Sequence, residues 1–366
     1  MGNPHRIGVI GLGVISGAYL ETLRDSGSIR ITAVADLDRS RADAVAATLP
    51  GTAAMSVAEL LGSDTVDTVL NLTIPAAHAE IALAAIAQGK NVYGEKPIAT
   101  SISDAQSIMR AAAHAGVRIG SAPDTVLGTG TQTARSAVAA GLIGRPLAAT
   151  ATMVTPGHER WHPHPDFYYQ PGGGPMLDMG PYYISALIHV LGPVRSVIGS
   201  ASRLRPQRTI TNGPRSGEQI VVEVETHVTG VLEHESGALT TITTSFDGNA
   251  TTASPIEIHG ELGSLTAPDP NQFAGEVRLA RNGDKEWETV PISAGYVDGA
   301  RGAGLLDFVA ATAERPSRAG GDIALHAFDV MDTLLESART GLRLPVRTTV
   351  ERPSLVPLTD RADWLG

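Results

Sequence analysis

Apolar and polar positions follow two different patterns along the chain, and the first covers about its first third. Five runs rich in β-branched residues are separated by alanine-rich stretches with helical spacing: RIGVIG from residue 6, IRITAVAD from residue 29, VDTVLNLTI from residue 66, NVYGE from residue 91 and VRIGSA from residue 117. Such runs are typical of strands buried on both faces of a parallel sheet. We predict a doubly wound α/β domain over residues 1–125.

Polar residues mark the expected ends of the helices between these strands. Ser56 with Glu59, and Ser103 with Gln106, have the spacing of a capping box, in which side-chain and backbone groups satisfy one another at a helix start. Gly116 lies where a glycine typically ends a helix.

After about residue 145 the pattern becomes that of antiparallel strands joined by tight turns. The expected strands are LAATATMV (147–154), RSVIGSAS (195–202), IVVEVETHVTGVLEH (220–234), ALTTITTSF (238–246) and the pair flanking Asn282 and Gly283. Few helices separate them: one follows the GGGP stretch at 172–175, and another lies near 322–340. We predict that residues 126–366 form an α+β domain with a large open, mostly antiparallel sheet.

Composition narrows the class of protein. With 366 residues, of which 42% are apolar and 18% charged, the chain suits a globular protein of two domains. Its formal charge is 28 − 38 = −10 with no run of Lys or Arg, so nucleic acid and membranes are poor partners. Zero cysteines exclude disulfides, thiolate zinc sites and cysteine nucleophiles. We expect a cytoplasmic protein, because no leader precedes the first strand and no stretch has the ~18 apolar residues of a membrane span.

The stretch GHERWHPHPD, residues 157–166, contains the H-E-x-x-H pattern of zinc proteases at His158, Glu159 and His162. That site requires both histidines on one turn of a helix. Prolines on both sides disfavour a helix here, and no third ligand is evident downstream. We therefore predict no metal site.

The stretch VIGLGVISG, residues 9–17, places a glycine turn between an expected strand and an expected helix. In dinucleotide-binding domains the first glycine, here Gly11, permits the tight turn, and the second, here Gly13, lets the backbone approach the pyrophosphate. The third position is taken by Ser16, which is small enough for close packing. A glycine turn that binds no ligand is the alternative.

Asp36 ends the second expected strand, where a carboxylate can hold the adenosine ribose hydroxyls. It would repel a 2′-phosphate and therefore favours NAD as the cofactor. Arg39 and Arg41 follow closely and leave NADP open as an alternative.

Lys96, in the stretch YGEKPIAT, ends the strand NVYGE, and ligands of open α/β sheets bind at the carboxyl ends of strands. Together with TIPAAH at residues 73–78 and G-G-G-x-x-x-D-x-G at residues 172–180, this E-K-P element resembles the Gfo/Idh/MocA family of NAD(P)-dependent oxidoreductases. The resemblance runs over nearly the whole chain. A solvated surface lysine would be the ordinary interpretation of Lys96, but its place at a strand end between Glu95 and Pro97 favours a functional one.

The resemblance implies a Rossmann domain, a larger α/β domain with an open sheet, and sugars, inositols or related polyols as substrates. In relatives the E-K-P lysine contacts both the nicotinamide ribose and the reacting hydroxyl, and its peptide bond to proline tends to be cis. The expected cofactor-binding residues are Gly11, Gly13, Val14, Ile15, Ser16, Asp36, Thr73, Ile74, Pro75, His78, Glu95, Lys96 and Pro97.

In the helix after the glycine run, helical spacing places Asp178, Tyr182, Ser185 and His189 on one stripe. Many family members carry a histidine acid or base four residues after the aspartate, where this chain has Tyr182, as glucose-fructose oxidoreductases do. The phenol can serve if an ammonium such as that of Lys96 lowers its pKa from about 10. We predict Tyr182, Lys96 and Asp178 as catalytic residues and His189 as structural. A helix-capping aspartate and a core tyrosine are the alternatives.

The loop before the glycine run offers aromatic faces and hydrogen-bonding groups suited to a hydroxyl-rich ring. The expected substrate-binding residues are Lys96, Asp124, Trp161, His162, Tyr168, Asp178 and Tyr182, with His164 and Asp166 as further members of the loop. A purely structural loop is the alternative.

The leading hypothesis is a dehydrogenase or reductase that moves hydride between NAD(P) and a secondary alcohol or ketone of a sugar, glycoside or inositol-like polyol. A non-catalytic NAD(P)-binding sensor or co-regulator of the same fold is the second, and a zinc hydrolase the third. An exposed face of the large sheet would suit a homodimer or homotetramer, as in relatives.

Overall fold

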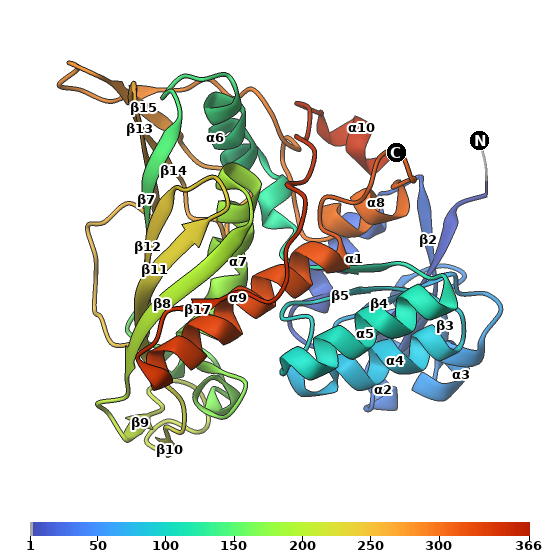
Figure 1. Ribbon diagram of the computed structural model, residues 1–366. Helices are drawn as coiled ribbons and strands as arrows, with labels where there is room; N and C mark the ends of the chain where they lie inside the picture. Colours follow the sequence, from blue (N-terminus) through green and yellow to red (C-terminus); the bar gives the residue numbers. More distant parts are fainter. Residues whose placement is uncertain (1–2) are drawn as a thin grey trace. The chain divides into compact units, whose positions relative to one another are not determined.

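The computed structural model describes residues 3–366 and divides into two compact units (Figure 1). Unit 1 consists of Met1–Thr129, Ala294–Leu325 and Pro353–Gly366, and unit 2 of Gly130–Ser293 and His326–Arg352. The first break lies within a few residues of the predicted boundary at 125. Residues 294–325 and 353–366 return to unit 1, so the two units are not the two continuous ranges 1–125 and 126–366.

Unit 1 contains a six-stranded parallel sheet with strand order β3-β2-β1-β4-β5-β6. Its strands are β1 His5–Ile10, β2 Ile29–Ala35, β3 Ala53–Met55, β4 Thr68–Asn71, β5 Asn91–Gly94 and β6 Ile119–Ser121. The predicted doubly wound domain is confirmed. Strand β3 was not among the five predicted strands, because its three residues are too few to form a hydrophobic run. The strand order reverses between β1 and β4, so ligands are expected at the carboxyl ends of these strands.

The helices of unit 1 are α1 Ser16–Leu23, α2 Arg39–Thr48, α3 Val57–Gly62, α4 His78–Ala87, α5 Ile102–Ala115, α8 Ala303–Val309 and α10 Arg361–Leu365, with short 3-10 turns η1 Pro75–Ala77 and η2 Thr125–Leu127. The predicted capping box of Ser56 and Glu59 is confirmed at the start of α3. The box predicted at residues 103 and 106 is wrong. Ser101 has extended backbone geometry and caps α5 instead, its Oγ accepting from the Asp104 N–H at 3.1 Å.

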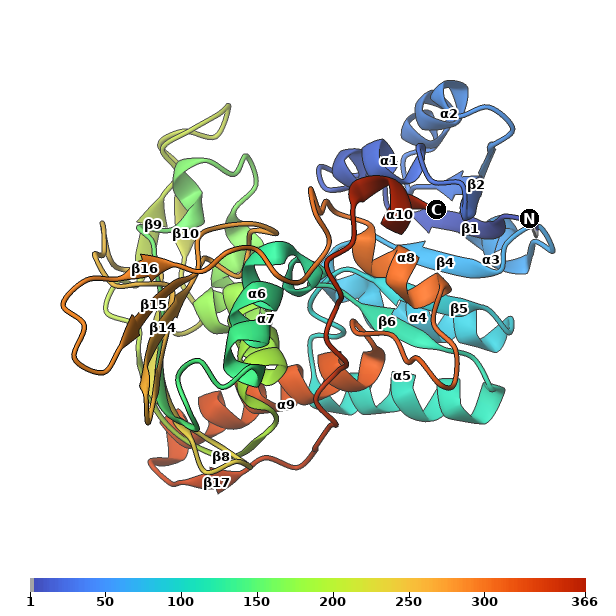
Figure 2. The ribbon, with the colours of Figure 1, turned by 90° about the horizontal axis from the view of Figure 1, so that it is seen from above.

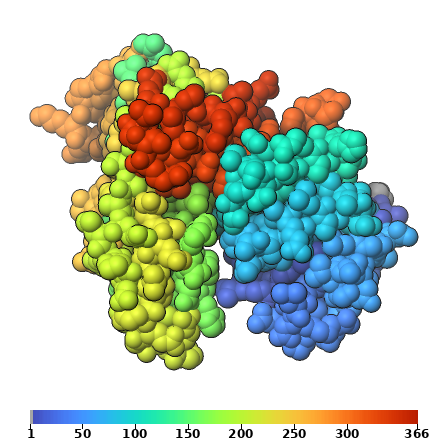
Figure 3. Space-filling view, turned by 60° about the horizontal axis from the view of Figure 1, so that its bottom comes forward, coloured from blue at the N-terminus to red at the C-terminus, as the bar shows by residue number. Residues whose placement is uncertain are grey.

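Helices α4 and α5 pack side by side on one face of unit 1, light blue and teal in Figure 3. Helix α5 ends at Gly116, whose φ of 67° is the left-handed conformation that glycine adopts at helix ends, as predicted.

The edge strand β6 is covered by a later part of unit 1. The Ser121 N–H donates to the Ala319 carbonyl at 3.1 Å, and Gly120 forms an antiparallel bridge with Gly320. The final helix α10 also returns to this unit and lies against α8 (Figure 2). Covering an edge in this way prevents it from pairing with another chain.

Unit 2 contains a nine-stranded sheet with order β16-β15-β14-β13-β7-β12-β11-β8-β17. Its strands are β7 Pro146–Val154, β8 Val194–Ser202, β11 His227–His234, β12 Leu239–Ser245, β13 Ile256–Gly260, β14 Gly263–Ala267, β15 Arg278–Arg281, β16 Glu288–Thr289 and β17 Leu344–Pro345. All neighbours are antiparallel except β7 and β12, so the predicted mostly antiparallel sheet is confirmed. The run 220–234 forms two strands, because β10 (Gln219–Val221) pairs with β9 (Gln207–Thr209) in a separate small sheet.

Helices α6 Thr129–Ala139, α7 Gly174–Leu191 and α9 Gly321–Thr340 complete the regular helices, with 3-10 turns η3 His158–Arg160 and η4 Asp166–Tyr169. Helix α7 packs on β7, β11 and β12 of the large sheet. The side chains that alternate with the buried ones are mostly small and polar; they include Thr150, Thr152, Thr229, Thr241 and Thr243, which are exposed or half-buried. Over residues 3–366, the helices are all too short or too polar to cross a membrane.

His326 of α9 is a buried histidine that should make unit 2 sensitive to acid. Its Nε2 accepts from the Val194 N–H at 3.1 Å, so Nδ1 carries the hydrogen and donates to the Thr348 hydroxyl at 3.0 Å. Burial lowers the pKa of His326 from 6.5 to about 4, against a smaller opposing effect of Asp329. Between pH 4 and pH 6.5, His326 therefore carries a proton in the unfolded chain but not in the folded chain. The resulting stability is complete above pH 6.5 and is lost as the pH falls towards 4.

We expect the free energy of unfolding to fall by about 2 kcal/mol between pH 7.5 and pH 5 on account of His326 alone. Urea unfolding at both pH values measures it. The variant His326→Gln keeps one donor and one acceptor but does not titrate, so its pH dependence should be smaller by this amount. An equal pH dependence in both proteins would contradict the assignment.

Candidate active site

The glycine turn after β1 has the geometry that close approach of a phosphate requires. Gly11 has a φ of 94°, and a Cβ there would lie 2.6 Å from the Leu72 carbonyl carbon, so no other residue fits. Gly13 is exposed, and a Cβ would meet nothing within 4 Å. The Ser16 hydroxyl donates to the Gly13 carbonyl at 2.7 Å and fixes the turn. The backbone of Gly13 therefore faces open space.

Helix α1 starts directly after this turn, and no side chain caps it. Of its first N–H groups, that of Ser16 donates to the Gly13 carbonyl and that of Ala18 to the Ile15 carbonyl, each at 3.2 Å, and the helix dipole favours an anion at this end. Val14 is 91% exposed, so the tip of the turn lies at the surface. Ile15 is half-buried at the helix start.

Asp36 fastens the glycine turn to the end of β2. Its Oδ2 accepts from the Leu12 N–H at 2.7 Å, and its Oδ1 accepts from the Asp38 N–H at 2.9 Å. Each carboxylate oxygen keeps a second lone pair with which it can accept from a ribose hydroxyl. Arg39 and Arg41, which left NADP open, pair with acidic side chains of α2 and its cap, Asp43 and Asp38 respectively.

His78 joins the loops that follow β4 and β5. Its Nε2 lies 2.9 Å from the Thr73 carbonyl oxygen, and its Nδ1 lies 2.7 Å from the Pro97 carbonyl oxygen. Both partners are acceptors, so the ring nitrogen that carries the hydrogen donates to its carbonyl, and the other nitrogen packs against the second loop. His78 is nearly fully buried, whereas Ile74 beside it is exposed. His78 therefore holds the two loops together, with Ile74 at the surface.

Glu95 is also a buried residue that holds its neighbours. Its Oε1 accepts from the Tyr19 hydroxyl at 2.8 Å, and its Oε2 accepts from the backbone N–H of Lys96 at 3.0 Å. Burial, and secondarily the carboxylate of Glu95, raise the pKa of Tyr19 well above its ordinary value. The peptide bond between Lys96 and Pro97 is cis, as the resemblance implied.

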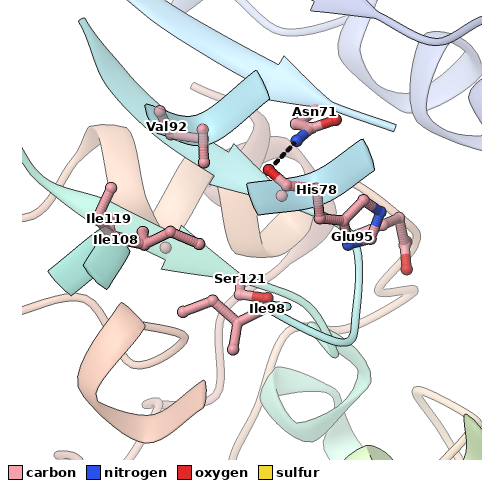
Figure 4. A pocket seen from close by; sticks show the side chains of 11 residues that line it. Asn71, His78, Val92, Glu95, Ile98, Ile108, Ile119 and Ser121 are labelled. Atoms are coloured by element: carbon pink, nitrogen blue, oxygen red, sulfur yellow. Dashed lines mark hydrogen bonds between the residues drawn. The ribbon is translucent and has the colours of Figure 1, made fainter. Parts of the chain in front are cut away.

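A cavity of about 10 Å³, with room for about one water, lies next to Glu95 in unit 1. Figure 4 shows Asn71, His78 and Glu95 at one end of it, with Ile98 and Ile108 among the apolar side chains that line the rest; a dashed line joins the Asn71 amide to the His78 carbonyl. It is too small for a dinucleotide, so it is a packing feature of unit 1.

Asp124 does not have the exposure that its predicted role as a sugar ligand requires. It is fully buried in unit 1, where its Oδ2 accepts from the Gly302 N–H at 2.8 Å and its Oδ1 pairs with Arg301 at 3.2 Å. Burial raises the pKa of Asp124, against the opposing effect of Arg301. The carboxylate ties the segment before α8 to the end of β6, and we no longer count it among the substrate ligands.

In unit 2 the predicted stripe of functional residues lies on α7. Asp178 is at its first turns with a side chain 13% exposed, and Tyr182, Ser185 and His189 are buried. His189 Nδ1 lies 3.2 Å from the Gln132 side-chain amide, so a neighbouring helix accounts for it structurally. Asp178 and Tyr182 remain the residues of this stripe nearest the start of the helix.

The H-E-x-x-H stretch is divided among separate contacts. His158 lies on the short 3-10 turn η3, and its Nε2 is 2.8 Å from Asp178 Oδ2. Glu159 is buried and pairs with Arg208 at 3.0 Å. In the described part of the chain, residues 3–366, no group of three or more His, Asp or Glu side chains is arranged to hold a metal ion.

Aromatic rings surround this turn and continue along the loop. Trp161 and Phe167 are 55% and 41% exposed, and the ring of Tyr168 lies 4.0 Å from that of Phe167 between centroids. His162 packs edge-on against Tyr168, with centroids 5.4 Å apart, and burial lowers its pKa. Three of these residues, Trp161, His162 and Tyr168, were predicted from the sequence.

Sequence reasoning missed His158 and Phe167 as members of this group. His158 was considered only as a zinc ligand, and Phe167 not at all. The density of aromatic residues between 161 and 169 was the available signal for Phe167. No pattern in the sequence brings residue 158 to residue 178, because the loop between them lacks regular spacing.

Two family models match most of the chain. Residues 5–122 match the oxidoreductase family with an NAD-binding Rossmann fold, and residues 131–266 match the GFO/IDH/MocA C-terminal domain. Their boundaries fall close to the break between units 1 and 2.

Comparison with individual proteins points to the same family. The chain is 31% identical to inositol 2-dehydrogenase 3 of Saccharopolyspora erythraea, over 75% of this chain and 78% of that protein. It is 28% identical to D-xylose 1-dehydrogenase (NADP(+)) 2 of Haloferax volcanii, over 84% and 90% of the two chains. Its fold is similar to that of an NAD binding oxidoreductase from Klebsiella pneumoniae, with a TM-score of 0.80 and 24% identity over 94% of this chain and 99% of the other. The chain therefore belongs to the Gfo/Idh/MocA family of oxidoreductases, and it is an NAD(P)-dependent dehydrogenase.

Proposed function

We propose that the protein moves hydride between NAD and a secondary alcohol or ketone of a sugar, glycoside or inositol-like polyol. The observation that carries this proposal is the 31% identity to an inositol 2-dehydrogenase over three quarters of the chain. The D-xylose dehydrogenase, matched over a still larger share, acts on a related hydroxyl-rich ring. The exposed aromatic side chains of Trp161 and Phe167 suit the apolar faces of such rings.

The residues of unit 1 fit a dinucleotide. The open backbone of Gly13 and the uncapped start of α1 would receive the pyrophosphate, and Asp36 would accept from the adenosine ribose. When bound, the nicotinamide supplies the carbon that accepts or donates the hydride. We favour NAD over NADP because a 2′-phosphate beside Asp36 would face a carboxylate, while the nearby arginines already pair with acids.

We assign three side chains of the family pattern to the reaction, each with its own role. As the phenolate, Tyr182 takes the proton of the alcohol during oxidation; as the phenol, it returns a proton to the ketone oxygen during reduction. The ammonium of Lys96 stabilises the negative charge that develops on the substrate oxygen. Asp178 accepts a hydrogen bond from a substrate hydroxyl and orients the ring.

The second hypothesis from the sequence, a non-catalytic dinucleotide sensor, is not favoured, because the chain belongs to a family of dehydrogenases. It would need the cofactor-binding residues of unit 1 but none of Lys96, Asp178 and Tyr182. The chain has all three.

We also propose that the protein forms a homodimer or homotetramer through the large sheet of unit 2. Its threonine-rich face is exposed or half-buried along β7, β11 and β12. Light scattering of the purified protein measures the mass, and a monomer at micromolar concentration would contradict this part of the proposal.

The test of function is a screen of sugars, glycosides and inositols with NAD and NADP, followed by the absorbance of the reduced cofactor. We expect turnover of at least one such substrate, with a higher kcat/KM for NAD than for NADP. Dinucleotide binding without turnover of any member of the set would contradict the proposed substrate class.

A further inference from the structure

We propose that His158 is a positioning residue for Asp178: a single neutral tautomer donates from Nε2–H to the carboxylate and holds it in one orientation for the reaction. The inference rests on the proposed function, in which Asp178 orients the substrate. All the residues that carry it lie in unit 2.

The tautomer of His158 follows from its partners. The indole N–H of Trp161 can only donate, and it lies 3.1 Å from His158 Nδ1. Nδ1 must therefore accept, which places the hydrogen of the neutral ring on Nε2. That nitrogen lies 2.8 Å from Asp178 Oδ2, so it donates to the carboxylate.

Both ring nitrogens are thus engaged, and this separates His158 from a catalytic base. It could accept a proton from a substrate only by giving up its contact with Trp161. The donated hydrogen bond holds one oxygen of Asp178, which fixes the direction of the whole carboxylate. The indole N–H of Trp161 is used as well, so Trp161 offers a substrate its ring face.

The surroundings hold His158 in place. Its backbone N–H donates to the Tyr169 hydroxyl at 3.2 Å, and that hydroxyl donates to the carboxylate of Glu159. The buried guanidinium of Arg208 donates to the same carboxylate at 3.0 Å. A turn anchored on both sides in this way gives its side chain little freedom, as precise positioning requires.

The imidazole ring is also enclosed by aromatic rings. Its centroid lies 4.4 Å from that of Tyr168, on η4, and 4.6 Å from that of Phe246, which directly follows β12. The side chain of His158 is only 11% exposed. Water therefore has little access to the hydrogen bond with Asp178, which strengthens its effect on the carboxylate.

Two substitutions separate positioning from simple packing. His158→Phe keeps a ring but removes the donor, and it should lower kcat about 10- to 100-fold while KM for NAD changes less than about twofold. His158→Gln places an amide N–H near the position of Nε2 and should recover kcat to within about fivefold of the original protein. The exposed His114 of α5 provides the control His114→Gln, which should leave kcat unchanged. Urea unfolding of every variant confirms that the fold is kept.

A spectroscopic measurement tests the same inference without turnover. In the 15N-labelled full chain at pH 8, the imidazole shifts of His158 should show a protonated Nε2 and an accepting Nδ1, assigned by their loss in His158→Gln. Trp161→Phe removes the indole donor but leaves the Asp178 carboxylate, which still needs a hydrogen on Nε2, so the Nε2–H tautomer should persist in this variant.

The outcomes distinguish this inference from the proposed function. If no sugar or polyol is turned over, the proposed function fails, and the tautomer is still measured. Two results would overturn the positioning role and leave the proposed function intact. One is an active dehydrogenase in which His158 carries its hydrogen on Nδ1; the other is an equal kcat for the His158→Phe and His158→Gln variants.

Discussion

Replacing Lys96 by methionine is expected to lower kcat by about 10²- to 10⁴-fold, the range that a positioned acid, base or charge contributes. Methionine keeps much of the side-chain length and removes the ammonium. The charge that develops on the substrate oxygen then loses its partner, whereas the pyrophosphate and adenosine contacts remain. NAD affinity, measured by calorimetry, should therefore change by less than about threefold.

The chain offers a matched control for this substitution. It has three lysines, and Lys285 lies exposed between β15 and β16. Lys285→Met should leave kcat unchanged. Lys90 is unsuitable because its Nζ donates to the carbonyls of Ser63 and Val66 in the interior of unit 1. A Lys96→Met enzyme that oxidises a confirmed substrate at the original rate would remove Lys96 from the mechanism.

The second large effect is expected at the glycine turn. Gly13→Val should weaken NAD binding by at least about 100-fold, or roughly 2.7 kcal/mol, because the branched side chain would occupy the space that the pyrophosphate needs. The structure itself tolerates the added atoms, since a Cβ at Gly13 meets nothing within 4 Å. Calorimetry with NAD measures the effect, and circular dichroism checks the fold.

Gly62, at the end of α3, is the matched control. It is exposed, belongs to the same unit, and has equally open space around a Cβ. Gly62→Val should retain the NAD affinity of the original protein. If Gly13→Val also retained it, the turn would not be the pyrophosphate site.

The hydrophobic pattern predicted the two kinds of sheet because it reports whether strands are buried on both faces or on one. It did not predict which strands pair. In the large sheet, β7 lies between β12 and β13, and the parallel pairing of β7 with β12 joins residues far apart in the sequence. Nor did it predict that residues 294–325 and 353–366 return to unit 1, since their contacts are set by packing over the whole unit.

For the candidate site, sequence spacing placed residues near the ends of strands and helices but could not give the direction of their side chains. Glu95 and His78 follow strands of unit 1 as predicted, yet both are buried and hold loops together. Asp124 is likewise turned into the interior. A position at a strand end is set by chain register, whereas inward or outward orientation is decided by the packing around it. The roles of Lys96, Asp178 and Tyr182 stay predictions.

The covering of β6 by residues 319 and 320 has a practical consequence for anyone dissecting this enzyme. A fragment that ends near residue 125 would contain every strand of the parallel sheet. It would lack residues 319 and 320, with which Ser121 and Gly120 of the edge strand pair. In such a fragment the edge strand β6 would be unpaired and could bind the same edge of other copies, so we expect the fragment to aggregate. A stable minimal nucleotide-binding module needs the segment around α8 spliced back on, and a single cut cannot supply it.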